Sequence, residues 1–175
     1  YWYHLTYGWA TATTRPGSDW YGPLRWRDAW IPVGYWIDTT GTPSGITESA
    51  FITYVQRCYQ TWEDDPGSYI DYSYLGTKTG VTWGNNDGNN MFVWLLSGET
   101  WVGVCSFWGS LIEGDYDSLR IEDADVALNL RYSWSAAETC PSDKFDVQNV
   151  GTHEVGHGTG LADLYDSGDS EQTMY

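Results

Sequence analysis

Residues 146–163 read DVQNVGTHEVGHGTGLAD and decide how the chain is expected to fold. Asp146 is a good N-cap, so a helix is expected from there to about Gly158. Gly151, Gly156 and Gly158 each destabilise such a helix by about 1 kcal/mol relative to alanine. Because its own helix propensity is weak, this segment must be held by tertiary packing or by a ligand, which indicates a functional site.

Two histidines of this segment have the spacing of a shared metal site. His153 and His157 are four residues apart, so they stand on one helical face and can bind one zinc ion. Glu154 lies between them and can act as general base on a zinc-bound water without binding the metal. A left-handed Gly160 would turn the chain back, so that Asp163 supplies a third ligand. Three protein ligands with one open position are typical of catalytic zinc.

Outward from this segment, the chain contains one further helix pattern and several strand patterns. Apolar residues spaced by three and four predict a helix over 46–62 with Thr47 as N-cap. Residues 109–123, GSLIEGDYDSLRIED, are expected to form a long solvated loop; its carboxylates could hold calcium but lack the spacing of a calcium motif. Period-two or continuous apolar runs predict strands over 33–39, 69–75, 91–96, 102–108 and 124–129.

Length and charge limit the class of protein. The chain has 175 residues, which is enough for one domain with a sizeable core. No stretch approaches the roughly 18 to 20 apolar residues that span a bilayer, so no membrane span is expected. Eight Lys and Arg against 24 Asp and Glu give a formal net charge of −16, which argues against a nucleic-acid partner. Such acidity is typical of a solvated surface and also fits bound cations such as calcium.

Aromatic residues and cysteines leave alternatives open. The chain holds 12 Trp, 14 Tyr and 4 Phe, whose even spread favours packing in the core over a sugar-stacking or interaction surface. Cys58, Cys105 and Cys140 form no CxxC pair, so neither a thiol zinc site nor a dense disulfide framework is indicated. One disulfide and one spare thiol remain compatible with the sequence, in any of three pairings.

Several segments together resemble a known family. HEVGHGTGLADLYD at 153–166, followed by TMY at 173–175, resembles the active-site helix and Met-turn of the metzincin zinc endopeptidases, and within them the matrixin-type proteases of microbes. The segments at 87–95, 123–134 and 143–152 also resemble matrixin segments. The resemblance covers roughly residues 30–175, so we expect an aromatic-rich N-terminal extension over 1–30 and a catalytic domain over 31–175.

The resemblance implies an α+β fold with a twisted five-stranded mixed sheet, a backing helix and an active-site helix. It implies that His153, His157 and Asp163 bind zinc, that Glu154 is the catalytic base, and that Met174 forms a floor under the metal. It also implies that an edge strand pairs with an extended substrate. The residues expected to contact the substrate are Val102, Gly103, Val104 and Tyr175.

The sequence departs from the family pattern in three ways. Most metzincins have histidine as third ligand, whereas Asp163 resembles the snapalysin-like minority and should make the metal a weaker Lewis acid. The sequence ends one residue after the Met-turn, so either a fragment or a minimal C-terminal part is expected. No PRCGxPD-type latency motif is present. Cys58 or Cys105 could serve as a latency thiol, the alternative being a buried structural cysteine.

These features predict a zinc-dependent endopeptidase that hydrolyses protein or peptide substrates through a zinc-activated water, with Glu154 as general base. Zinc is the expected cofactor, and calcium is a second candidate. The lack of an initiator Met and the acidic composition suggest a secreted protein, and the oligomeric state is not predicted. The alternative is a non-catalytic extracellular module that binds sugars or assembles with itself, with a vestigial or structural zinc site. A zinc hydrolase acting on a substrate other than peptide is the third hypothesis.

Overall fold

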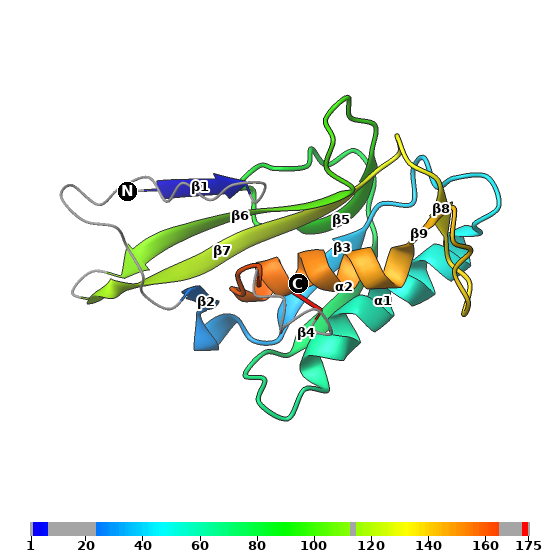
Figure 1. Ribbon diagram of the computed structural model, residues 1–175. Helices are drawn as coiled ribbons and strands as arrows, with labels where there is room; N and C mark the ends of the chain where they lie inside the picture. Colours follow the sequence, from blue (N-terminus) through cyan, green and yellow to red (C-terminus); the bar gives the residue numbers. More distant parts are fainter. Residues whose placement is uncertain (1, 7–23, 113–114, 165–172, 175) are drawn as a thin grey trace.

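The computed structural model describes residues 2–6, 24–112, 115–164 and 173–174. This part of the chain forms an α+β fold with two α-helices on one face of a large sheet (Figure 1). The elements are β1 (Trp2–Thr6), β2 (Leu24–Trp26), a short 3-10 helix (Asp28–Trp30), β3 (Val33–Ile37), α1 (Glu48–Glu63), β4 (Tyr72–Thr77), β5 (Asn90–Leu95), β6 (Gly103–Ile112), β7 (Asp115–Asn129), β8 (Trp134–Ser135), β9 (Phe145–Asp146) and α2 (Val147–Thr159).

The main sheet has seven strands in the order β1-β6-β7-β5-β3-β4, with β2 also paired to β7. β2, β3, β4, β5 and β7 form parallel pairs, whereas β6 runs antiparallel to β7 and β1 runs antiparallel to β6. The expected count of five strands is therefore wrong. The two additional strands are β1 and β2, which come from the segment expected to be an N-terminal extension and pair with the sheet.

Both α-helices begin where the sequence predicts. The Thr47 hydroxyl accepts a hydrogen bond from the Ala50 N–H at 3.1 Å, and the Asp146 carboxylate accepts one from the Asn149 N–H at 2.8 Å. Each cap satisfies an N–H that has no partner within its helix. α1 packs against α2, and α2 packs against β6 and β7. Neither helix in the described part of the chain is long and apolar enough to cross a membrane.

Aromatic side chains fill much of the core between the sheet and the helices. The Tyr35 and Tyr59 rings stack with centroids 3.7 Å apart, and Phe51 and Trp94 lie 4.8 Å apart. Among the described side chains, the buried aromatic residues are Trp26, Tyr35, Phe51, Tyr54, Tyr59, Phe92, Trp94, Phe107 and Trp134. The preference for core packing is confirmed for these residues.

The expected acidic loop over 109–123 is wrong, because β6 continues to Ile112 and β7 begins at Asp115. The two strands form a long antiparallel pair (Figure 1). Apolar Ile121 packs in the core between the sheet and the helices, while Asp123 is also fully buried. Buried carboxylates interrupt the apolar alternation, which hid the strand period from a pattern based on hydrophobicity.

All three cysteines carry free thiols. Cys58 and Cys105 are buried within the core between the sheet and the helices, and Cys140 is half-buried. Burial raises the pKa of Cys58 to about 12 and raises the pKa of Cys105 as well. These two thiols therefore fit the structural alternative better than a latency role.

Candidate metal centre

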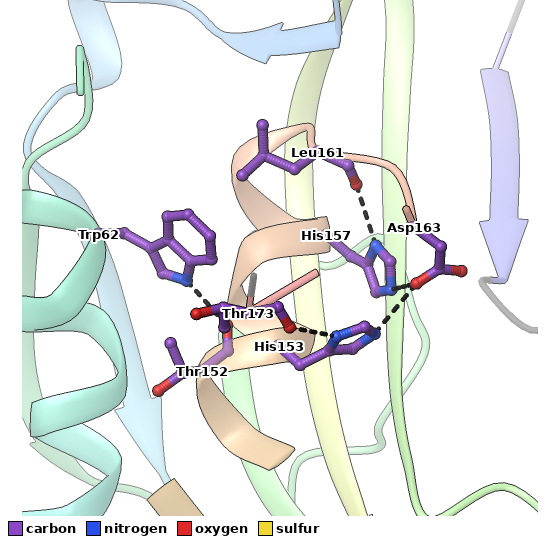
Figure 2. Close-up of polar contacts among 7 residues, drawn as sticks. All are labelled: Trp62, Thr152, His153, His157, Leu161, Asp163 and Thr173. Atoms are coloured by element: carbon purple, nitrogen blue, oxygen red, sulfur yellow. Dashed lines mark hydrogen bonds and ion pairs between the residues drawn. The ribbon is translucent and has the colours of Figure 1, made fainter. Parts of the chain in front are cut away.

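Three side chains converge at the C-terminal half of α2. His153 and His157 project from one face of the helix, and Asp163 returns toward them after the helix has ended (Figure 2). Oδ1 of Asp163 lies 3.1 Å from Nε2 of His153 and 3.2 Å from Nε2 of His157. The three donor atoms lie within 4.8 Å of one another. We refer to these residues as the metal centre.

A glycine turn brings Asp163 to the histidines. Gly160 ends α2 with φ of +105°, a left-handed conformation that L side chains rarely adopt. The backbone N–H of Leu161 donates to the Gly156 carbonyl at 3.1 Å and closes the turn. The space is also restricted, because a Cβ at Gly160 would lie 2.1 Å from the carbonyl oxygen of Leu24. Glycine is therefore required for both conformation and space.

Backbone carbonyls orient both imidazole rings. Nδ1 of His153 lies 2.9 Å from the Thr173 carbonyl, and Nδ1 of His157 lies 3.0 Å from the Leu161 carbonyl (Figure 2). A carbonyl only accepts, so each Nδ1 carries the proton, and in the neutral ring the lone pair for a metal is then on Nε2, the nitrogen nearest Asp163. Burial lowers the pKa of His157, which favours the neutral ring that binds a metal.

The metal centre can hold a metal ion. Tetrahedral zinc with ligands at about 2.0 to 2.1 Å requires donor atoms about 3.3 Å apart. The separations of 3.1 and 3.2 Å from Asp163 Oδ1 to the two Nε2 atoms are close to this value. Two imidazoles and one carboxylate also form a donor set that zinc accepts. The donor set and the two distances from Asp163 are therefore compatible with a bound metal ion, of which zinc is the expected one.

Glu154 lies beside the metal centre as a buried carboxylate with 7% exposure. Its Oε1 packs against β6, where a Cβ at Gly103 would come within 2.8 Å of it. Burial raises the pKa of Glu154 to about 8, and the negative charge of Asp163 acts in the same direction, while the Cys105 backbone N–H opposes it. A carboxylate with a raised pKa is a stronger base than one in water.

An open cleft of about 360 Å³ contains the metal centre and Glu154. Its lining residues are Trp101, Val102, Gly103, Asn149, Val150, His153, Glu154, His157, Asp163 and Thr173. Two of the expected substrate-binding residues, Val102 and Gly103, are therefore in the cleft wall. Val104 instead packs on the opposite face of the sheet with Met91 and Val93, and Tyr175 lies outside the described residues.

The edge of β6 beside the cleft is only partly covered. β1 pairs with Ser106–Ser110 of β6. Within the described chain, Gly103–Cys105 have β7 on one side and no strand on the other. A free strand edge presents unpaired N–H and C=O groups to an extended peptide. Since the Cys105 N–H faces the Glu154 carboxylate, the part of β6 open to a substrate is short, and its pairing with a peptide stays a prediction.

Met174 is buried against α2, as expected for a residue beneath the metal centre. Its side chain is 5% exposed, and its Sδ lies where a Cβ at Gly156 would come within 2.4 Å. Its carbonyl accepts a hydrogen bond from the Leu164 N–H at 2.7 Å, which ties the Met174 segment to the chain after the glycine turn. The role of Met174 as a floor for the ion stays a prediction.

Two buried aspartates form a second polar region that the motif search missed. Asp125 accepts hydrogen bonds from the N–H groups of Gly84 at 2.6 Å and Met91 at 2.8 Å. Asp123 accepts from the Gly88 N–H at 2.7 Å. Burial raises the pKa of Asp125 to about 8 and that of Asp123 to about 7. We refer to Asp123 and Asp125 as the acidic anchor; their alternation in IEDADV was the available signal of a strand.

A scan against protein-family models finds no match, and a search of curated proteins finds no relative. The function of the cleft therefore has to be argued from its residues and their geometry.

Proposed function

We propose that the protein is a zinc-dependent endopeptidase of the metzincin type, secreted by its source cell. One observation carries the proposal: the Nε2 atoms of His153 and His157 and an oxygen of Asp163 converge in an open cleft that also contains Glu154. The resemblance of residues 153–166 and 173–175 to the metzincin helix and Met-turn, which includes the same three ligands, also supports the proposal.

The metal centre and Glu154 would divide the chemistry between them. A bound zinc ion would supply Lewis acidity and lower the pKa of a water molecule toward neutrality. His153, His157 and Asp163 hold fixed positions through the turn and the two backbone carbonyls. Glu154 takes a proton from the attacking water and returns it to the leaving amine, and its raised pKa suits both steps.

The walls of the cleft suit an internal stretch of peptide. An extended chain can add to β6 along Gly103–Cys105, where the N–H and C=O groups are not used by β1. The described lining of the cleft contains no Lys or Arg that could bind a terminal carboxylate. This favours cleavage within a chain over removal of its C-terminal residue.

Metal analysis and proteolysis on one purified sample test the proposal. The protein is treated with a chelator, dialysed, and supplied again with zinc, and casein cleavage is followed at each stage by mass spectrometry. We expect one zinc per chain, loss of cleavage on chelation, recovery with zinc, and products cut at internal bonds.

Three other results would each overturn the proposal. Zinc binding without cleavage would leave a vestigial or structural site. Glycan binding or self-assembly that survives chelation would favour the non-catalytic module. Iron(II) in place of zinc would point to oxygenase chemistry, because two histidines and a carboxylate also bind iron(II).

A further inference from the structure

Two aromatic side chains from distant parts of the sequence close the C-terminal end of α2. A helix leaves its last four carbonyl groups without partners inside the helix. The Trp26 indole N–H donates to the Gly158 carbonyl at 2.8 Å, and the Tyr69 hydroxyl donates to the Thr159 carbonyl at 2.9 Å. We refer to Trp26 and Tyr69 as the aromatic clamp.

The two clamp residues are fixed to each other. The backbone N–H of Trp26 donates to the Tyr69 hydroxyl at 3.2 Å, so this hydroxyl accepts one hydrogen bond and donates another. Trp26 is 2% exposed, and the Arg25 guanidinium lies over the Tyr69 ring at 4.9 Å. β2, which carries Trp26, lies beside the end of α2 (Figure 1). The aromatic clamp is therefore a hydrogen-bonded contact between β2, the segment of Tyr69 and the end of α2.

The clamp acts where the chain turns toward the metal centre. The Leu24 carbonyl, also on β2, sits against Gly160 so closely that a Cβ there would come within 2.1 Å. The backbone of β2 and the clamp side chains thus enclose the turn from one side. A turn confined in this way has few alternative conformations.

The same turn positions two of the three metal-binding groups. The carbonyl of Leu161, the residue after Gly160, lies 3.0 Å from Nδ1 of His157 and orients that ring (Figure 2). Asp163 follows two residues later and brings Oδ1 to the histidines. His153 depends on a different segment, because its Nδ1 faces the Thr173 carbonyl.

We infer that Trp26 and Tyr69 are positioning residues of the metal centre, which fix the turn after α2 and through it His157 and Asp163. The inference rests on the metal-binding part of the proposed function. Hydrogen-bonding partners behind metal ligands typically change metal affinity by about 10 to 100-fold when they are removed. The clamp stands one step further back and is expected to act at the lower end of that range.

Conservative variants of the full chain test this role. Tyr69→Phe removes only the hydroxyl, and Trp26→Phe removes the indole N–H. Zinc dissociation constants are measured by competition with a chromophoric chelator, beside thermal unfolding of each metal-free variant. Tyr132→Phe and Trp134→Phe are matched controls, because they remove a hydroxyl bond to the Thr100 carbonyl at 2.6 Å and an indole bond to the Asn129 carbonyl at 2.8 Å.

We expect Tyr69→Phe and Trp26→Phe each to weaken zinc binding by about ten-fold, and the two controls to bind zinc as the wild type does. NMR adds a readout that a general loss of stability would not reproduce. The Nδ1–H signal of His157 should shift in the clamp variants, and that of His153 should stay in place.

The possible outcomes separate the inference from the proposed function. Zinc affinity within two-fold of wild type in both clamp variants would overturn the inference alone, as would equal losses in the controls. Zinc binding that responds as expected, in a protein that cleaves no casein, would overturn the endopeptidase and leave the inference standing. A wild-type chain that binds no zinc would overturn both.

Discussion

The metal centre and the acidic anchor both contain carboxylates, half-buried in Asp163 and buried in Asp123 and Asp125, and they surround them with opposite kinds of atoms. At the metal centre, Asp163 Oδ1 lies 3.1 and 3.2 Å from imidazole nitrogens whose lone pairs face it. At the acidic anchor, Asp125 faces the N–H groups of Gly84 and Met91 at 2.6 and 2.8 Å. At the metal centre a carboxylate oxygen meets imidazole nitrogens that can bind a cation. At the acidic anchor carboxylate oxygens meet backbone N–H donors.

This difference decides what each region can do. Neutral imidazoles and a carboxylate are stabilised at this distance by a proton or a cation between them, so the metal centre is suited to bind an ion. Backbone N–H groups satisfy both oxygens of Asp125 and Oδ2 of Asp123 without any ion, while Oδ1 of Asp123 is buried with no hydrogen-bond partner among the described residues. The acidic anchor is therefore suited to hold the 84–91 segment onto β7. An acidic sequence therefore does not by itself indicate a cation site. Whether an acidic segment binds a cation depends on which atoms its carboxylate oxygens contact in the folded protein.

The largest effect is expected from Glu154→Gln, which tests whether the buried carboxylate beside the metal centre does chemistry. Loss of a general base should lower the rate of casein cleavage by about 10² to 10⁴-fold. Zinc content should stay at the wild-type level, because Glu154 is not one of the three converging ligands. Cleavage by Glu154→Gln at the wild-type rate would contradict the mechanism.

Asp163→Ala tests whether the converging oxygen is a ligand. Removing it leaves two imidazoles, so zinc affinity should fall by more than the roughly 100-fold upper range for a partner behind a ligand. The change is measured with the same competing chelator. Asp125→Asn is the matched control, since it alters a buried carboxylate of the other region. Equal zinc affinity in wild type and Asp163→Ala would exclude Asp163 from the metal centre.

Asp125→Asn should lower the free energy of unfolding by about 2 kcal/mol, because the amide has one acceptor oxygen for two facing N–H groups. Urea unfolding of the metal-free protein measures this loss. Asp87→Asn, in the exposed part of the same segment, should change the free energy by less than about 0.5 kcal/mol. If the two variants were equally stable, the N–H contacts of Asp125 would contribute nothing to folding.

The last prediction is a pH dependence of stability at the acidic anchor. The pKa values of Asp123 and Asp125 are raised from 3.8 to about 7 and about 8, chiefly by burial. Between about pH 4 and pH 8 these two carboxyl groups bind more protons in the folded chain than in the unfolded chain. Their contribution to the free energy of unfolding is therefore greatest below about pH 4 and declines as the pH rises toward 8. Each group contributes up to about 1.4 kcal/mol per pH unit.

Urea unfolding of the metal-free protein across this range checks the sign. After burial, the charge of Asp123 is the next cause that raises the pKa of Asp125, and the charge of Asp87 acts on both carboxyls, so Asp125→Asn is compared with the wild type at every pH. The destabilisation caused by Asp125→Asn should shrink as pH rises. A destabilisation that stays constant or grows with pH would contradict the raised pKa of Asp125.

The sequence predicts the local features of the fold and of the metal centre. Thr47 and Asp146 cap the two helices as expected, because an N-cap and its N–H partner lie three residues apart. His153 and His157 share a helical face by the same local geometry, and Gly160 takes the left-handed conformation that its position requires. Val102 and Gly103 lie in the cleft wall, while their expected contact with a substrate stays a prediction.

Contacts between distant segments could not be predicted in this way. The strand count was wrong, and the extended pair of β6 and β7 was missed, because both depend on pairing between distant segments. Register also decides that Val104 packs with Met91 and Val93 on the face opposite the cleft. The N–H donors of the acidic anchor stand 34 and 41 residues from Asp125. The pattern of apolar residues within one segment does not predict a hydrogen-bond partner so far away in the sequence.

The sequence by itself determined where the helices start, where α2 turns, and which three residues can share an ion, since backbone preference and short spacing act within a few residues. Only the tertiary structure decided how these parts are held. Trp26 reaches the Gly158 carbonyl across 132 residues of sequence, and β1 and β2 complete the sheet beside the cleft. Such contacts form because buried polar groups and strand edges need partners, which the folded chain supplies from wherever they lie in sequence.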